Sequence, residues 1–176
     1  MLESLAFALV KTFITFMFQQ NLEHMQAVHI QGAPSWYYQQ TSEHICDSGF
    51  AYGRLEAVDA AKAEARKQMV LRLRNAMESV VYDHFRDKTD PAERALIDSF
   101  KQDANLPVFV EGSVVYENIE YREKRSTAYT RVCIPKERLQ AYQEERVGKL
   151  KKAVTLHHRD RAFDTLDSEL SVQPSQ

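Results

Sequence analysis

The sequence lacks the short motifs that identify common catalytic and nucleotide-binding sites. It contains no HExxH or CxxC spacing for zinc and no GxSxG turn around a nucleophilic serine. It also lacks the GxGxxG fingerprint and the lysine of a P-loop. No internal repeat or low-complexity block is present. The motifs therefore point to no reaction, and function has to be argued from architecture and resemblance.

Strong charge of either sign is missing as well. The formal net charge is −2 at pH 7, and the 176 residues are 27% charged and 44% hydrophobic. These values are ordinary for a folded chain of one domain, and they create no general attraction to nucleic acid or an anionic membrane. We expect no nucleic-acid partner. The basic residues are unevenly distributed along the chain, because Lys11 is the only lysine or arginine before Arg54.

Cysteine is scarce, with only Cys46 and Cys133. Both fall in segments expected to form strands, so a sheet can bring them close together. We favour two half-buried free thiols, with a disulfide in an oxidising compartment as the alternative. Cys133 has apolar neighbours, among which a thiol tends to stay protonated and inert. The cysteine count alone therefore leaves the compartment open.

No apolar run has the length of an ordinary membrane span. Residues 5–18 are mostly apolar but fall short of the roughly 20 residues needed to cross a bilayer, and no basic region precedes them. Three interpretations remain: an atypical signal or anchor, an amphipathic helix on a membrane or partner, and a helix packed in the core. We favour the first, so that residues 1–20 form an apolar helix contacting the membrane through Leu2–Phe18.

The middle of the chain carries the clearest architectural pattern. Residues 21–42 form a polar connector, and a β-prone segment follows at 43–52 with a glycine at position 49. An alanine-rich helix is predicted to begin between residues 55 and 60 and to run to about Phe85. Its small side chains leave a shallow surface against which a sheet can pack closely.

A second helix is predicted to begin at Asp90. Asp90 suits the cap, Pro91 suits the first helical position, and Glu93 is placed to complete a capping box. This helix should end before Pro107, near Asn105.

A β-hairpin and a terminal helix are predicted to follow. Apolar residues alternate along 108–116 and again along 128–134, on either side of a polar turn at 122–125. Pro135 ends the second strand, and a helix begins at Lys136. Periodicity is lost over residues 156–176, which predicts a flexible tail.

These elements predict an α+β domain over residues 43–155. A small three-stranded antiparallel sheet is packed by the long Ala-rich helix and a C-terminal helix, with the N-terminal apolar helix added. The other face of so small a sheet needs a cover, either the terminal helix or another subunit. We therefore expect a homo-oligomer.

The search for chemistry assigns no catalytic, cofactor-binding, metal-binding or lipidated residue. His44 and Cys46 share one face of a strand, so a two-ligand metal contact is geometrically possible. An edge-strand histidine beside a small thiol is the simpler interpretation. Ser113 falls in a strand pattern without the sharp turn of a nucleophilic serine. The chain is expected to be a non-enzyme without a cofactor.

Several short patterns resemble those of a known family. They are Pro34-x-Trp36, Gly49-x-Ala51, Asp59-Ala60-Ala61-x-Ala63-x-Ala65, Glu111-Gly112-Ser113 and Tyr129-Thr130-Arg131-Val132. In these positions the chain resembles the LPP-twenty family of small bacterial outer-membrane lipoproteins, which is similar in turn to FlgP-like flagellar-disk lipoproteins. The resemblance covers about residues 34–145. It implies a compact α+β sandwich with a structural role in assembly at the cell envelope.

One departure from the family pattern concerns lipidation. A lipoprotein carries its lipid on a cysteine just after the signal, whereas the first cysteine here is Cys46, inside a predicted strand. Lipidation at the usual place is therefore not expected. Leu2–Phe18 is then predicted to serve as an uncleaved anchor in place of the lipid.

Three functional hypotheses follow. The first is a non-enzymatic, membrane-associated and self-assembling protein of the bacterial cell envelope, periplasmic or at the outer membrane, that contacts other envelope proteins; a cytoplasmic location is the alternative. The second is a dodecin-like oligomer that binds a small flavin-like ligand, with Trp36 and Tyr37 or Tyr52 stacked on the planar ring. The third is an enzyme with an unrecognised site near His44 and the two cysteines.

Overall fold

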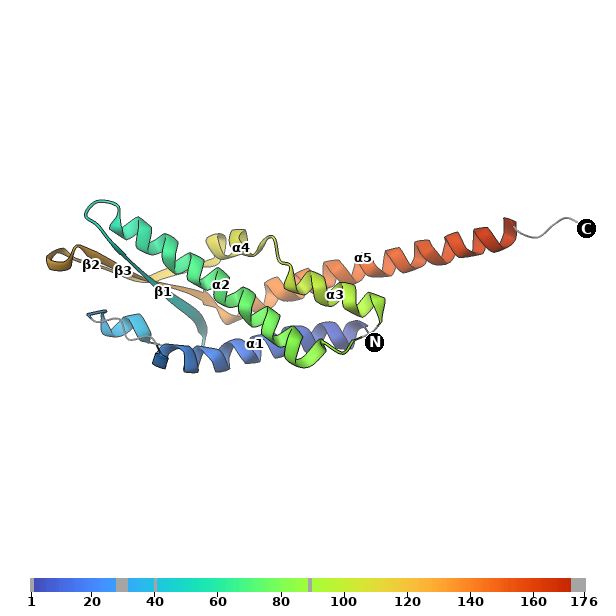
Figure 1. The fold of residues 1–176 in the computed structure, drawn as a ribbon, viewed down its shortest axis with the longest axis horizontal. Helices are drawn as coiled ribbons and strands as arrows, with labels where there is room; N and C mark the ends of the chain where they lie inside the picture. Colours follow the sequence, from blue (N-terminus) through green and yellow to red (C-terminus); the bar gives the residue numbers. More distant parts are fainter. Residues whose placement is uncertain (1, 28–31, 40, 89, 172–176) are drawn as a thin grey trace, which may run out of the picture.

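The computed structural model describes residues 2–27, 32–39, 41–88 and 90–171 of the chain (Figure 1). A small sheet lies at one end of an elongated molecule, and helices pack beside it and beyond it. The last helix projects from the body as a single rod. The predicted α+β class is confirmed.

The sheet has three antiparallel strands in the order β1–β3–β2. They are β1 (His44–Tyr52), β2 (Val115–Arg122) and β3 (Thr127–Pro135). The central strand β3 is buried on both faces along nearly its whole length. A bulge in β2 between Tyr116 and Asn118 shifts its register against β3. The predicted antiparallel three-stranded sheet is confirmed.

Helix α2 (Ala57–Phe85) lies across one face of the sheet. Gly49 of β1 sits directly beneath it. A Cβ atom at Gly49 would lie 2.6 Å from the carbonyl oxygen of Ala61 and 2.4 Å from the backbone nitrogen of Ala65. The long alanine-rich helix is confirmed, and its close approach to the sheet depends on small residues on both sides.

The other face of the sheet is covered by a short 3₁₀ segment, η1 (Ser35–Tyr38). The Tyr37 ring packs edge-on against Tyr129 of β3, with ring centroids 5.8 Å apart. The indole Nε1 of Trp36 donates to Glu120 of β2 at 3.4 Å. We expected the terminal helix or another subunit on this face, and η1, a piece of the predicted connector, lies on part of it. The predicted packing of the sheet with the Ala-rich helix, a C-terminal helix (Lys136–Ser171) and an N-terminal helix (Leu2–Ala27) is confirmed.

Helix α1 (Leu2–Ala27) packs into the main core. Leu9, Phe13 and Met17 have no exposed surface, and the Phe13 ring meets Phe100 edge-on at a centroid distance of 5.9 Å. This arrangement corresponds to the third interpretation of the apolar segment, a helix packed in the core, rather than to the favoured anchor. Among the described helices, none combines the length and the apolar character needed to cross a membrane.

The predicted connector is partly helical. Because α1 continues to Ala27, regular structure extends several residues past the expected boundary at residue 20. Residues 28–31 and 40, also in the predicted connector, lie outside the described residues.

Helix α3 (Pro91–Lys101) begins where the capping pattern predicts. One carboxylate oxygen of Asp90 accepts hydrogen bonds from the backbone nitrogens of Ala92 and Glu93 at 2.9 and 3.1 Å. These bonds satisfy two donors at the helix start. The helix ends at Lys101, a few residues before the predicted end near Asn105.

The prediction of a strand over residues 108–113 is wrong. This segment belongs to helix α4 (Leu106–Ser113), and β2 begins only at Val115. Leu106, Val110 and Ser113 are buried, a spacing that follows the helical period, whereas Val108 is 72% exposed. The alternating valines fitted both periods over so short a stretch.

Helix α5 (Lys136–Ser171) is longer than predicted. Its first half packs against α1 and α3, and its second half projects away from the body (Figure 1). The segment from residue 156 was expected to be a tail without regular structure, but it is helical through Ser171. Residues 172–176 lie outside the described residues.

Candidate functional site

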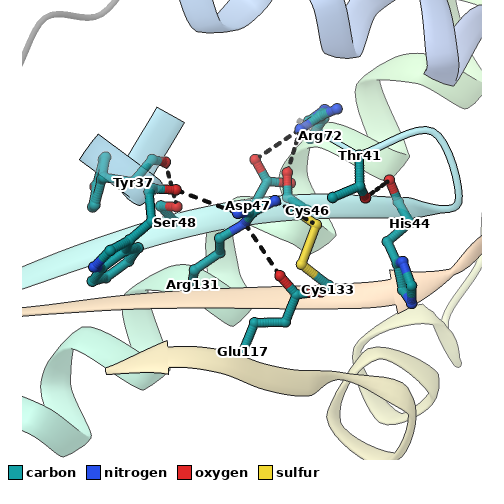
Figure 2. Close-up of a disulfide and its surroundings, with 11 residues drawn as sticks. Tyr37, Thr41, His44, Cys46, Asp47, Ser48, Arg72, Glu117, Arg131 and Cys133 are labelled. Carbon is teal, nitrogen blue, oxygen red and sulfur yellow. Dashed lines mark hydrogen bonds and ion pairs between the residues drawn. A yellow bond between two sulfur atoms is a disulfide. The ribbon is translucent and has the colours of Figure 1, made fainter. Parts of the chain in front are cut away.

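The two cysteines form a disulfide across β1 and β3. Cys46 and Cys133 occupy directly opposed positions in the register, with a Cα–Cα distance of 4.1 Å (Figure 2). Both are buried, and the bond joins positions 87 residues apart in the chain. The favoured prediction of free thiols is therefore wrong, and the disulfide that we left as the alternative is present. Local spacing gave no sign of it because the partners meet only through the sheet.

A buried arginine lies beside the disulfide. Arg131 precedes Cys133 by two residues in β3, so both side chains point to the same face. Its Nη2 lies 3.4 Å from the sulfur of Cys46, and its Nε lies 3.7 Å from a carboxylate oxygen of Glu117 in the β2 bulge. Its Nη1 donates to the carbonyl oxygen of Trp36 at 3.4 Å. This guanidinium therefore links β1, β2, β3 and η1.

Burial lowers the pKa of the Arg131 guanidinium, and the carboxylate of Glu117 opposes that shift. Even a lowered arginine pKa leaves the group charged at neutral pH. The site thus contains a buried cation held between a sulfur and an acid.

A second buried ion pair lies on the opposite face of β1. Nη1 of Arg72, from α2, lies 3.0 Å from a carboxylate oxygen of Asp47 and also donates to the carbonyl oxygen of Cys46 at 2.9 Å (Figure 2). Both side chains are about 90% buried. Adjacent residues of β1 point to opposite faces, so the strand is tied to α2 by Asp47 and to β3 by Cys46.

The sulfur pair also belongs to the one group of potential metal ligands found among the described residues. Cys46, Cys133 and Glu117 place their ligand atoms within 4.8 Å of one another. The two sulfurs are bonded to each other, and a thiolate is the form that binds metal. The cation of Arg131 already contacts Cys46 and Glu117. These residues therefore do not fit a metal centre in the oxidised protein.

The aromatic residues around η1 pack mainly against one another. Tyr37 contacts Tyr38 at a centroid distance of 5.1 Å, and Phe50 contacts Tyr52 at 5.6 Å, both edge-on. Burial, followed by the neighbouring Tyr38, raises the pKa of the Tyr37 hydroxyl. The contacts of Tyr37 pack η1 against the sheet. The flavin-binding hypothesis stays a prediction.

A third polar cluster ties α3 to α5, and sequence reasoning missed it. Asp103 is buried, accepts hydrogen bonds from the Tyr142 hydroxyl at 3.0 and 3.1 Å, and lies 3.0 Å from Nη1 of Arg146. Burial lowers the pKa of Arg146, whereas Asp103 opposes this shift. The Nη2 of Arg146 donates to the carbonyl oxygen of Ser99 at 2.8 Å. These groups satisfy each other and hold the helices in register.

Two surface grooves are found away from the disulfide. The larger, about 840 Å³, lies between α2 and α3, and the smaller, about 290 Å³, lies between α3 and α5. Four basic and two acidic side chains line the larger groove: Arg86, Lys88, Arg94, Lys101, Glu78 and Asp98.

The other candidate residues from the sequence do not form a reaction centre. His44 lies at the start of β1, with its imidazole apart from the disulfide (Figure 2), and Ser113 is buried at the end of α4. In the part of the chain whose side chains are described, neither His44 nor His84 makes a hydrogen bond or ion pair with a serine, cysteine or carboxylate. The side chains of four further histidines, at positions 24, 29, 157 and 158, fall outside that part.

Comparisons of this chain with family models, curated proteins and solved structures found no significant match. The resemblance to the LPP-twenty family therefore stays a prediction.

Proposed function

We propose that this chain is a non-enzymatic structural protein of the bacterial cell envelope that works outside the cytoplasm and associates with copies of itself. The observation that carries this proposal is the buried disulfide between β1 and β3. Persistent structural disulfides are typical of oxidising compartments and rare in the cytosol.

The surroundings of the disulfide favour a structural bond over a catalytic one. A redox-active disulfide exposes at least one sulfur to its partner, because exchange begins when a thiolate attacks that sulfur. Here Cys46 and Cys133 have at most 1% of their surface exposed. η1 and the charged side chain of Arg131 lie over the same face.

A non-enzymatic role is supported by how the buried polar groups are used. Asp47, Arg72, Asp103 and Arg146 bond to one another or to backbone carbonyls that hold the fold together. An active site instead directs such groups toward a cavity where a substrate can reach them. None of these four residues lines the larger groove, and Arg146, which lines the smaller one, has its guanidinium bonded to Asp103 and to the carbonyl oxygen of Ser99.

Membrane contact through Leu2–Phe18 remains part of the prediction in a narrower form. Leu9 and Phe13 are buried in the core, whereas Phe7 is 68% exposed on the opposite side of α1. Membrane attachment that keeps the fold intact would have to use this outer side of α1. Contacts with other envelope proteins therefore account for more of the proposed association with the envelope.

Fractionation of cells that make the native protein tests the proposed location. Cytosolic, periplasmic and membrane fractions are separated, and each is checked with a resident marker protein. We expect the chain in the periplasmic or membrane fraction. Recovery with the cytosolic marker alone would overturn the proposal.

A further inference from the structure

The second half of α5 stands apart from the rest of the molecule. Among the side chains that the structure describes, the last contacts between α5 and the body are the ion pair of Lys151 with Glu3, at 3.7 Å, and the groove wall formed by Ala153. Beyond them, Leu156 is 50% exposed and Phe163 is 59% exposed. These two apolar residues are seven positions apart, so they lie on the same side of the helix.

A lone helix of this kind is poorly stabilised by itself. Residues 153–171 extend about 27 Å at the rise of an α-helix. Most helices in proteins owe their stability to packing of an apolar face rather than to the helix propensity of their residues. A partner that covers Leu156 and Phe163 would therefore stabilise the projecting segment.

The charges of the projecting segment and of the helical turn just before it divide into two blocks. Residues 149–159 contain four basic residues and no acidic residue, and Lys149 and Lys151 among them also pair with Glu145 and Glu3. Residues 160–171 contain four acidic residues and one basic residue. Negative charge at the C-terminal end of a helix opposes the helix dipole, so the acidic block destabilises the helix on its own. A basic surface placed beside it would remove this penalty.

We propose that the projecting half of α5 pairs in antiparallel orientation with the same segment of a second copy of this chain. This pairing deepens the self-association proposed above and rests on it. The basic block of each helix then lies beside the acidic block of the other, and the two helix dipoles oppose each other favourably. Parallel pairing would place like blocks together, which costs free energy.

The centre of the pair falls near the boundary between the two blocks, at residues 159–160. Leu156 and Phe163 lie at about equal distances on either side of that boundary. Antiparallel pairing therefore brings the apolar residues of one helix against those of the other while the charge blocks match. The apolar side is compatible with this orientation, and the charge pattern selects it over the parallel one.

Exchange of the charges tests this arrangement in the purified, oxidised full-length chain. One variant reverses the basic block (Lys152→Glu with Arg159→Glu), and a second reverses the acidic block (Asp164→Lys with Asp167→Lys). A third combines all four changes and restores complementary blocks with opposite signs. Sedimentation velocity over a concentration series gives the dimer dissociation constant, and circular dichroism checks that each variant is folded.

We expect each single-block reversal to raise the dissociation constant about tenfold or more, and the combined variant to regain most of the loss. Raised salt should weaken the native dimer. Phe163→Ser should also weaken it, whereas Lys67→Ser, an exposed change on α2, should leave it unchanged.

Three results would overturn the pairing. They are a native chain that stays monomeric, reversals without effect, and a combined variant that fails to recover. An effect of the acidic-block reversal alone would instead place that block in another site, such as the basic groove between α2 and α3. An envelope-bound oligomer that is insensitive to these changes would reject this pairing and leave the proposed function standing. A chain that pairs as described but is found in the cytosol would reject the proposed function and leave the pairing standing.

Discussion

Two buried arginines hold the strands of the sheet in place. Arg72 and Arg131 approach β1 from opposite faces, and each contacts Cys46, one through its carbonyl oxygen and the other through its sulfur. Sequence reasoning gave neither arginine a structural role, although Arg131 stands in one of the resemblance patterns, because a lysine or arginine in a helix or strand pattern is usually exposed. Their roles depend on partners 26 and 85 residues away.

Removal of one buried partner should be costly. Arg72→Met removes the ion pair that Arg72 makes with the buried carboxylate of Asp47, and we expect a loss of about 3–5 kcal/mol in the free energy of unfolding. Urea unfolding measures it. Arg74→Met, an exposed change two positions along the same helix, serves as the control and should stay within about 0.5 kcal/mol of the native protein. Equal effects of the two changes would show that the buried pair has no special importance.

The tight contact at Gly49 predicts a second large effect. Gly49→Ala places a methyl group against the backbone of Ala61 and Ala65, which cannot move without shifting α2. We expect a loss of about 1–3 kcal/mol in unfolding experiments, the range typical of overpacking. Gly112→Ala is the matched change, since nothing lies within 4 Å of the added atom. It should be neutral or stabilise α4 by up to about 1 kcal/mol.

At the scale of elements, the sequence predicted best the helices whose first residues form a recognisable cap. Asp90 and Pro91 mark the start of α3 because capping is decided within one turn. The segment 106–113 carries Pro107 in its first turn, but a proline also commonly follows the end of a helix, and the valines suited a strand as well as a short helix. Local sequence patterns also could not predict the ion pairs or decide whether the disulfide forms, because these contacts join elements that only the fold brings together.

The contact between α3 and α5 predicts a response to alkaline pH. Burial first, and then the hydrogen bond to Asp103, raise the pKa of the Tyr142 hydroxyl above its ordinary value of about 10. A raised pKa in the folded state contributes stability that is complete below pH about 10 and is lost as pH rises toward the folded value. Tyr142→Phe removes this contribution.

We therefore expect Tyr142→Phe to lower stability by about 2 kcal/mol at neutral pH, because buried Asp103 loses a donor. Above pH about 10 the difference from the native protein should shrink. Denaturant unfolding at a series of pH values measures both effects. Tyr82→Phe, at a tyrosine that is 64% exposed, provides the control. A constant difference across the series would contradict the assigned role of the Tyr142 proton.

At the scale of the whole molecule, the disulfide is a covalent constraint between distant parts of the chain. It joins the strand before α2 to the strand before α5, so it restricts the unfolded chain over 87 residues. The chain-entropy model assigns about 4–5 kcal/mol to a loop of that length. Cys46→Ala with Cys133→Ala should lose about this much in urea unfolding. A double variant as stable as the native protein would remove the structural role proposed for the bond.

The redox state of Cys46 and Cys133 in the cells that make this protein tests the central claim most directly. Acid lysis stops thiol exchange, the protein is then alkylated in a neutral denaturant, and its intact mass is measured before and after chemical reduction. We predict no alkyl group before reduction and two groups when alkylation follows reduction. Two groups on the unreduced protein would mean that the cysteines are free in the cell, and they would contradict the proposed place of this chain in the envelope.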